Sequence, residues 1–168
     1  AKIFNPYVEY INTDYGNWES MDRTLPSLNY EQGLHLKAIA RIKKAVSVPV
    51  IASGRIIHPE MAEGVLKDGT ADLIGMAREL IAEPYWVKKI EAGDPDEIVE
   101  CIGCNQKCIG RLLQNRAISC VVNPAAGFEE DFSNDKLFSK LGKWKKVVVV
   151  GGGPSGMKAA EIAAKKGH

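Results

Sequence analysis

Four cysteines lie close together in the middle of the chain, and their side chains are the clearest candidates for chemistry. The only cysteines in the sequence are Cys101, Cys104, Cys108 and Cys120. A compact loop can hold three thiolates around one iron–sulfur cluster, while a more distant fourth thiolate completes the ligand set. Gly103 and Gly110 stand beside these residues, and glycine lets backbone N–H groups approach the sulfur atoms. The spacing therefore favours a [4Fe–4S] site.

Two other interpretations of the cysteines remain open. A structural zinc ion also accepts four cysteines, but zinc sites usually consist of two separated C-x2-C pairs, and only Cys101 and Cys104 have that spacing here. Disulfides are the third interpretation. No cysteine precedes Cys101, and such crowding in one segment favours a metal site over a disulfide framework.

A glycine-rich run near the end of the chain matches a second pattern. Residues 151–156 read G-G-G-P-S-G, four valines precede them, and helical sequence follows over 157–166. In a strand–turn–helix context Gly151 permits a tight turn, Gly153 lets the backbone approach a pyrophosphate, and Gly156 allows the helix to pack closely on the strand. The run predicts a buried strand and a dinucleotide site, with an ordinary βα turn as the alternative.

Small residues followed by arginine end two successive predicted strands, at Gly54 and Arg55 and again at Ala77 and Arg78. Loops of this kind after the last two strands of a (β/α)8 barrel form a phosphate site, and arginine can bind two phosphate oxygens at once. Each pair alone is equally typical of a surface loop. Their occurrence in consecutive units favours the phosphate site.

Strand and helix patterns alternate through the first ninety or so residues. Strands are predicted over 7–13, 48–54 and 71–77, and helices over 31–45, 59–69, 78–80 and 84–90. This alternation predicts parallel βα units and an α/β fold. Three strands are too few to close a barrel. Of the residues without a motif, Trp86 is expected in the core, and His35 and His58 are assigned to packing or helix starts because neither has a metal-ligand partner.

Composition excludes several classes of protein. The 168 residues carry 22 basic and 21 acidic side chains, so a nucleic-acid partner is not expected. The longest apolar run, Val147 to Val150, is far shorter than a membrane span. The first residues lack an initiator Met and the pattern of a secretory signal. We therefore expect a cytoplasmic protein whose sequence here begins inside a larger chain.

Four motifs in order carry a resemblance to a known family. They are Ile51-Ala-Ser-Gly-Arg-Ile, Gly75-Met-Ala-Arg-Glu-Leu-Ile-Ala-Glu-Pro, Cys101-Ile-Gly-Cys-Asn-Gln-Lys-Cys and Val148-Val-Val-Gly-Gly-Gly-Pro-Ser-Gly. Together they resemble the iron–sulfur NADH:flavin oxidoreductases of the old yellow enzyme superfamily, the type of 2,4-dienoyl-CoA reductase, 2-enoate reductase and trimethylamine dehydrogenase.

The resemblance implies a set of domains and cofactors. Residues 1–95 would be the last βα units of an FMN-binding (β/α)8 barrel, 96–126 a [4Fe–4S] segment, 127–145 a linker, and 146–168 the start of a Rossmann-like FAD-binding domain. It further implies that the FMN phosphate is held by Gly54, Arg55, Ala77 and Arg78, the cluster by Cys101, Cys104, Cys108 and Cys120, and the ADP half of FAD by Gly151, Gly153 and Gly156.

The activity implied by the resemblance is electron transfer from NAD(P)H through FAD and the cluster to FMN, which reduces an activated C=C bond in an unsaturated acid or thioester. The spacing of three residues between Cys104 and Cys108 resembles that of the reductases. The amine dehydrogenases have two residues at this place. The family's tyrosine acid would precede Ala1, so no catalytic residue is assigned. The alternatives are an amine dehydrogenase and a non-catalytic cluster-binding fragment. The remainder of the same enzyme is the expected partner, and a homo-oligomer stays open.

Overall fold

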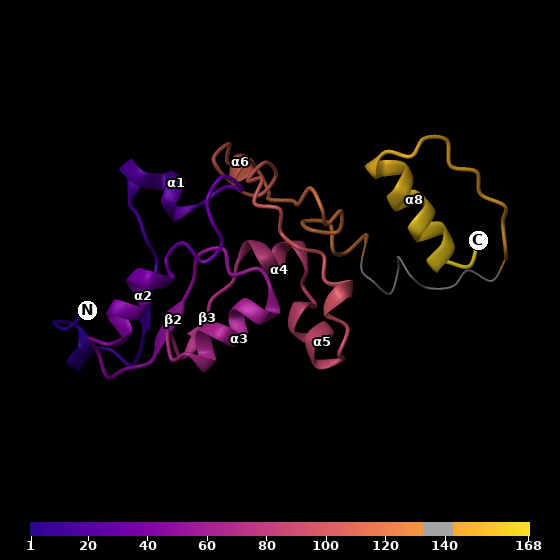
Figure 1. The fold of residues 1–168 in the computed structure, drawn as a ribbon. Helices are drawn as coiled ribbons and strands as arrows, with labels where there is room; N and C mark the ends of the chain where they lie inside the picture. The colour runs from indigo at the N-terminus through magenta and orange to yellow at the C-terminus, as the bar shows by residue number, and fades with distance from the viewer. Residues whose placement is uncertain (133–142) are drawn as a thin grey trace. The chain divides into compact units, whose positions relative to one another are not determined.

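The computed structural model describes residues 1–132 and 143–168. The chain divides into two compact units, Ala1–Asn123 and Pro124–His168, and Figure 1 shows the course of the chain through both. No helix in the described residues is long and apolar enough to cross a membrane.

A parallel sheet forms the centre of the first unit. Its strands are β1 (Ile11–Asn12), β2 (Val50–Ala52) and β3 (Leu73–Ile74), in that spatial order. Ile51 of the middle strand lies opposite Asn12 on one side and Leu73 on the other. Parallel strands end at the same edge of a sheet, so the residues that follow β2 and β3 are brought together.

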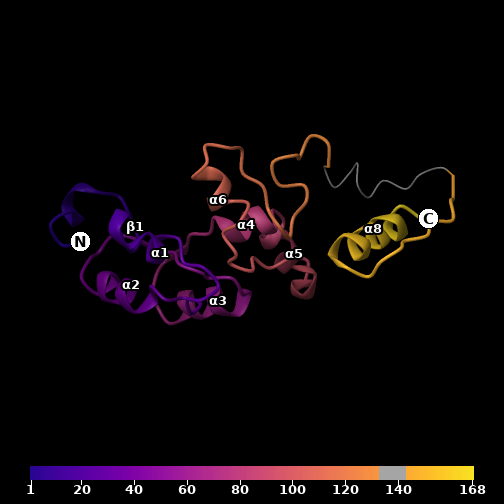
Figure 2. The ribbon, with the colours of Figure 1, turned by 90° about the horizontal axis from the view of Figure 1, so that it is seen from above.

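Helices connect and flank these strands. They are α2 (Leu36–Lys43) between β1 and β2, α3 (Pro59–Lys67) between β2 and β3, and α4 (Arg78–Ala82) and α5 (Trp86–Glu91) after β3. In the view of Figure 2 these helices follow one another from α2 on the left to α5 on the right. The alternation confirms the predicted α/β class. Each strand and helix is shorter than its predicted range, except α4, which extends two residues beyond the predicted 78–80.

The hydrophobic core lies between the sheet and its helices. It is formed by Ile39, Val50, Ala52, Ile56, Ala62, Val65, Ala71 and Trp86. Trp86 is buried as predicted, and its indole N–H donates to the carbonyl of Ile57 at 3.1 Å. Ile39 of α2 and Ala62 and Val65 of α3 are apolar positions that predicted these helices, and their side chains are buried here.

The first predicted strand and the loop after it differ from expectation. Residues Asn5–Tyr7 form a 3-10 helix, η1, because Pro6 suits a first helical turn, and only β1 remains as strand. In the predicted loop, η2 (Trp18–Ser20) and α1 (Met21–Thr24) are helical. Asn17 and Ser20 cap η2 reciprocally, and this N-x-x-S spacing was a readable signal.

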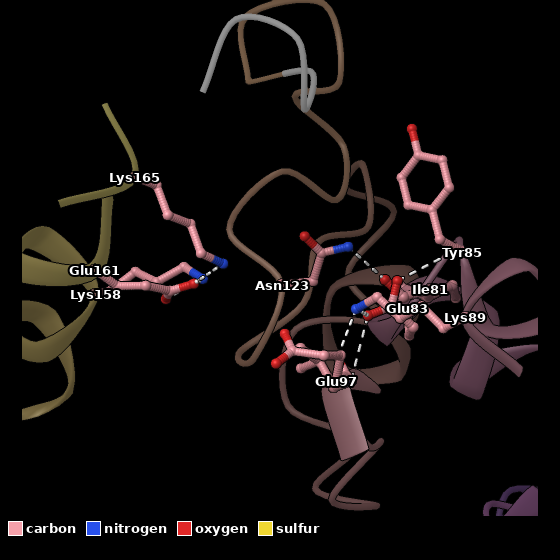
Figure 3. Close-up of polar contacts among 10 residues, drawn as sticks. Ile81, Glu83, Tyr85, Lys89, Glu97, Asn123, Lys158, Glu161 and Lys165 are labelled. Carbon is pink, nitrogen blue, oxygen red and sulfur yellow. Dashed lines mark hydrogen bonds and ion pairs between the residues drawn. The ribbon is translucent and has the colours of Figure 1, made fainter. Parts of the chain in front are cut away.

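The second unit contains one helix, α8 (Pro154–Lys165), among its described residues. Figure 3 shows Glu161 of α8 paired with Lys158 and Lys165, each at 2.8 Å. The buried strand predicted before the glycine run is wrong: no strand is assigned at 147–150 in the described residues, and Val150 is 95% exposed. A parallel strand needs a neighbouring strand to satisfy its backbone, and the described part of this unit offers none.

Candidate functional site

A cavity of about 400 Å³ lies where β2 and β3 end. All four residues predicted at the phosphate site line it, namely Gly54, Arg55, Ala77 and Arg78. Cavities of a few hundred Å³ are typical of sites for small ligands and cofactors. The structure therefore brings the two small-residue–arginine pairs together as the parallel topology predicts.

The backbone at these strand ends is available to an anion. In the described residues, the backbone N–H groups of Gly54, Arg55, Ala77 and Arg78 form no hydrogen bond with the protein. Unpaired N–H groups beside a cavity need a partner, and phosphate oxygens accept such bonds. The residues present fit the phosphate of a flavin nucleotide.

Gly54 is required by its own geometry and by His35. Its φ is +111°, and a Cβ here would stand 2.3 Å from Nδ1 of His35. The His35 ring is buried, its Nε2 lies 3.0 Å from the carbonyl oxygen of Arg23, and its Nδ1 has no partner in the described residues. His35 therefore packs as predicted, but it packs as part of the cavity wall.

The side chain of Arg55 has a different position from the one the motif predicts. Its Nη1 donates to the carbonyls of Ser27, at 2.6 Å, and of Tyr30, and the residue itself adopts a φ of +55°. These carbonyls occupy Nη1, whereas the buried Nε of Arg55 has no hydrogen-bond partner in the described residues. Arg55 therefore keeps both its backbone N–H and its Nε as donors without a protein partner.

Arg78 faces both the cavity and the cysteine segment. Its Nη1 donates to the carbonyl of Pro26 at 2.7 Å and to Oδ1 of Asn105 at 2.6 Å. Its Nε and Nη2 have no protein partner in the described residues. Both arginines therefore keep guanidinium nitrogens without a protein partner, and Arg78 is the one that also bonds to the cysteine segment.

The four cysteines are free and half-buried, and all four line one second cavity. Burial is the largest influence on Cys101 and raises the pKa of its thiol, and the charge of Glu79 acts in the same direction. The backbone of Gly103 hydrogen-bonds to Cys101 and opposes this rise in pKa. That bond is the kind of approach expected from a glycine between two ligands.

The donor set is the one that [4Fe–4S] clusters use, four thiols around one cavity. Within residues 1–132 and 143–168, no group of three or more His, Cys, Asp or Glu side chains is placed to hold a single metal ion. The assignment of the four cysteines as cluster ligands stays a prediction that their shared cavity supports.

Residues at the end of helix α4 hold the cysteine segment in place through hydrogen bonds. At its end Glu83 is buried and accepts from the backbone N–H of Val99 at 3.3 Å, two residues before Cys101. Asn123, three residues after Cys120, donates to the carbonyl of Ile81 at 2.8 Å, and Figure 3 shows this bond beside Glu83. Sequence reasoning missed these anchors because they join residues far apart in the chain.

The two cavities share a wall. Arg78, Ile81 and Cys108 line both of them. Cys108 begins the short helix α6 (Ile109–Leu112) as its N-cap residue, and Ile109 and Leu112 also line the larger cavity. A group held by the cysteines and a ligand held at the strand ends would therefore be neighbours.

The glycine run of the second unit has the predicted turn geometry. Gly151 adopts a φ of +108°, and a Cβ on Gly156 would stand 2.0 Å from the carbonyl oxygen of Gly151. Gly153 is the N-cap of α8, and a Cβ there would meet nothing within 4 Å. The turn and the helix start thus fit a pyrophosphate, although the preceding valines form no strand.

The chain is similar to a known protein family and to several known enzymes. A family model described as NADH:flavin oxidoreductase / NADH oxidase matches residues 8–97. An NADH oxidase from Thermoanaerobacter brockii is 46% identical over 96% of this chain and 24% of its own length. A cinnamate reductase from Clostridium sporogenes is 36% identical over 94% of this chain and 23% of its own length.

A solved structure is also similar. Histamine dehydrogenase from Rhizobium sp. 4-9 superposes with a TM-score of 0.88 and 28% identity over 99% of this chain and 24% of that one. The chain thus spans about a quarter of the length of the relatives it matches. Because the family match covers just over half of the chain and includes the ends of β2 and β3, the chain belongs to the NADH:flavin oxidoreductase / NADH oxidase family.

Proposed function

We propose that this chain is part of an oxidoreductase that passes electrons from NAD(P)H through FAD and a [4Fe–4S] cluster to FMN and reduces an activated C=C bond. The observation that carries the proposal is the shared wall, because Cys108 and Arg78 line both the cavity of the four cysteines and the cavity at the strand ends. When bound, the flavins and the cluster supply the hydride and electron transfer.

In this proposal the strand ends hold the FMN phosphate. The N–H groups of Gly54, Arg55, Ala77 and Arg78 donate to its oxygens, and Arg78 adds a charged donor. Residues 1–95 are then the last βα units of an FMN barrel. His35 closes the wall behind Gly54 and keeps water from that side of the site.

The cysteine segment and the glycine run have separate roles. Cys101, Cys104, Cys108 and Cys120 ligate the cluster in residues 96–126, and the hydrogen bond from the Gly103 backbone to Cys101 would help to set the reduction potential of the cluster. Gly151, Gly153 and Gly156 cradle the ADP half of FAD in residues 146–168.

The substrate is an unsaturated acid or thioester in this proposal. Similarity to a cinnamate reductase supports it, as do the three residues between Cys104 and Cys108. Amine oxidation is the second candidate, because histamine dehydrogenase superposes on nearly the whole chain. A cluster-binding piece without its own catalysis is the third.

The test is anaerobic purification of the full-length protein, followed by iron, zinc and flavin analysis. We expect about four irons per chain, with both FMN and FAD, and oxidation of NAD(P)H when an α,β-unsaturated acid or thioester is added. One zinc without iron would overturn the cluster. Turnover of amines without enoate reduction would select the second candidate, and bound cofactors without either activity would select the third.

A matched pair of variants tests the FMN site. Arg78→Ala removes a charged hydrogen-bond donor, and we expect the FMN dissociation constant to rise about 10- to 100-fold. Arg116→Ala removes the same charge from an exposed position outside both cavities and should leave FMN affinity unchanged. Equal affinity in both variants would remove Arg78 from the proposed site.

A further inference from the structure

Asn105 stands at the centre of the cysteine segment, between Cys104 and Cys108, in a backbone conformation that few side chains tolerate. Its φ is +56°. Its half-buried side chain uses both polar atoms: Nδ2 donates to the carbonyl of Leu25 at 2.8 Å, and Oδ1 accepts from Arg78 at 2.6 Å. One side chain therefore joins three segments of the first unit.

The segment around Leu25 belongs to the larger cavity. Leu25 and Pro26 line it, and Pro26 accepts from the same nitrogen of Arg78 at 2.7 Å. Two residues on, the N–H of Leu28 donates to the carbonyl of Gly103 at 2.9 Å. The loop carrying three cysteines is thus bonded directly to the wall of the strand-end cavity.

We propose that Asn105 couples the occupancy of the two cavities. A group bound in the cysteine cavity then strengthens ligand binding at the strand ends, and a ligand bound at the strand ends strengthens binding in the cysteine cavity. The inference rests on the proposed function for the identity of both ligands. A cluster fixes the positions of Cys104 and Cys108, and Asn105 between them then holds Arg78 and Leu25 in place. An ordered Arg78 binds the flavin phosphate at a smaller entropic cost.

Reciprocity makes this coupling measurable from either side, because two ligands that help each other do so by the same factor. We expect FMN to bind about tenfold more tightly to the iron-loaded protein than to the iron-depleted protein, a typical size for such coupling. FMN should likewise raise the affinity of the protein for iron by the same factor, measured as the iron retained at equilibrium with a chelator.

Asn105→Gly is the decisive variant, because it removes the side chain while glycine keeps the left-handed backbone without strain. Asn115→Gly is its matched control. Asn115 has a φ of +55° in the same segment, but its side chain is exposed and forms no hydrogen bond in the described residues.

The experiment measures FMN dissociation constants by flavin fluorescence in the full-length protein, with iron loaded or removed by chelation. We expect a ratio near ten for wild type and Asn115→Gly, and a ratio near one for Asn105→Gly. Asn105→Asp keeps the acceptor for Arg78 and should keep most of the ratio. If Asn105→Gly does not hold iron, this second variant still tests the coupling.

Two results would overturn the coupling: a wild-type ratio of one, or a ratio that survives Asn105→Gly. A wild-type protein that binds iron and FMN with a ratio of one refutes the coupling and leaves the proposed function intact. A wild-type protein that binds neither iron nor FMN refutes the proposed function, and the coupling falls with it.

Discussion

The contacts inside the first unit and those inside the second span very different distances along the sequence. In Ala1–Asn123, side chains join residues as far apart as Asn105 and Leu25, 80 positions away in sequence. In the described part of Pro124–His168, the ion pairs of α8 join residues three and four positions apart. Local contacts are enough for a helix and a turn, but a buried strand requires partners from elsewhere.

Two valine-rich segments make the same point. Val50 in β2 is fully buried because β1 and β3 flank its strand, whereas Val150 is 95% exposed. Both segments have the composition of a buried parallel strand. Composition therefore indicates where a strand can form, and the neighbouring strands decide whether it does.

The largest effect is expected in the first unit, at Gly54. Gly54→Ala forces a side chain into a φ of +111° and against His35. Strain and overpacking together should lower the free energy of unfolding by about 3–5 kcal/mol, measured by urea unfolding with tryptophan fluorescence. Adding His35→Ala should recover part of this loss by removing the clash; no recovery would mean that backbone strain alone sets the cost.

Removing the buried carboxylate of Glu83 should cost less. It accepts from Tyr85 N–H at 3.0 Å, from Lys89 Nζ at 2.5 Å and from Val99 N–H, as Figure 3 shows in part. Glu83→Ala removes the acceptor of the Tyr85 and Val99 N–H groups, while Lys89 keeps its bond to the carbonyl of Glu97. The free energy of unfolding should fall by about 2–3 kcal/mol. Iron content should fall as well, because Val99 leads into Cys101.

Glu83→Gln is the control for that variant, since the amide oxygen still accepts a hydrogen bond at the same place. We expect a smaller loss of stability and near-normal iron. If iron content is unchanged even in Glu83→Ala, then α4 does not position the cysteine segment, and the contrast in contact range between the two units loses one of its supports.

In the second unit a comparable substitution should stay local. Gly156→Ala places a Cβ 2.0 Å from the carbonyl oxygen of Gly151, so the turn must shift, at a cost of about 1–2 kcal/mol. FAD affinity should fall while FMN affinity and iron content stay constant. Gly152→Ala, which meets nothing within 4 Å, is the matched control, and equal FAD affinity in both variants would contradict the turn's proposed role.

The smallest effect is a pH dependence at Asp72. A hydrogen bond from Lys43 and a second from the Val50 N–H, each at 2.7 Å, lower the pKa of its carboxyl below the ordinary 3.8. The contribution to stability is therefore full above pH 3.8 and is lost as the pH falls through the lowered value. Because the carboxyl is 37% exposed, we expect about 0.5–1 kcal/mol.

Urea unfolding between pH 7 and pH 2.5 measures that loss, and Asp72→Asn should remove this part of the pH dependence. An unchanged profile in the variant would show that the bonds of Asp72 with Lys43 of α2 and with β2 contribute nothing measurable. The long-range character of the first unit would then rest on its buried contacts alone.

Much of the first unit could be predicted from sequence, because its signals are periodic. The apolar positions of α2 and α3 and the small residues after β2 and β3 indicated both the βα units and the cavity at their ends. The direction of the Arg55 side chain could not be predicted, because it depends on carbonyls of Ser27 and Tyr30 that only the folded chain brings near. Asn105 was missed for the same reason.

The anchoring of the cysteine segment to α4 also decides where the chain tolerates a change of length. Bonds through Val99, Asn105 and Asn123 fix both of its ends and the region before Cys108. Between them Leu113 is 71% exposed, and residues 112–117 are all exposed. An affinity tag or a fluorophore-bearing peptide inserted at 113–116 would therefore lengthen the loop while the cysteines keep their positions.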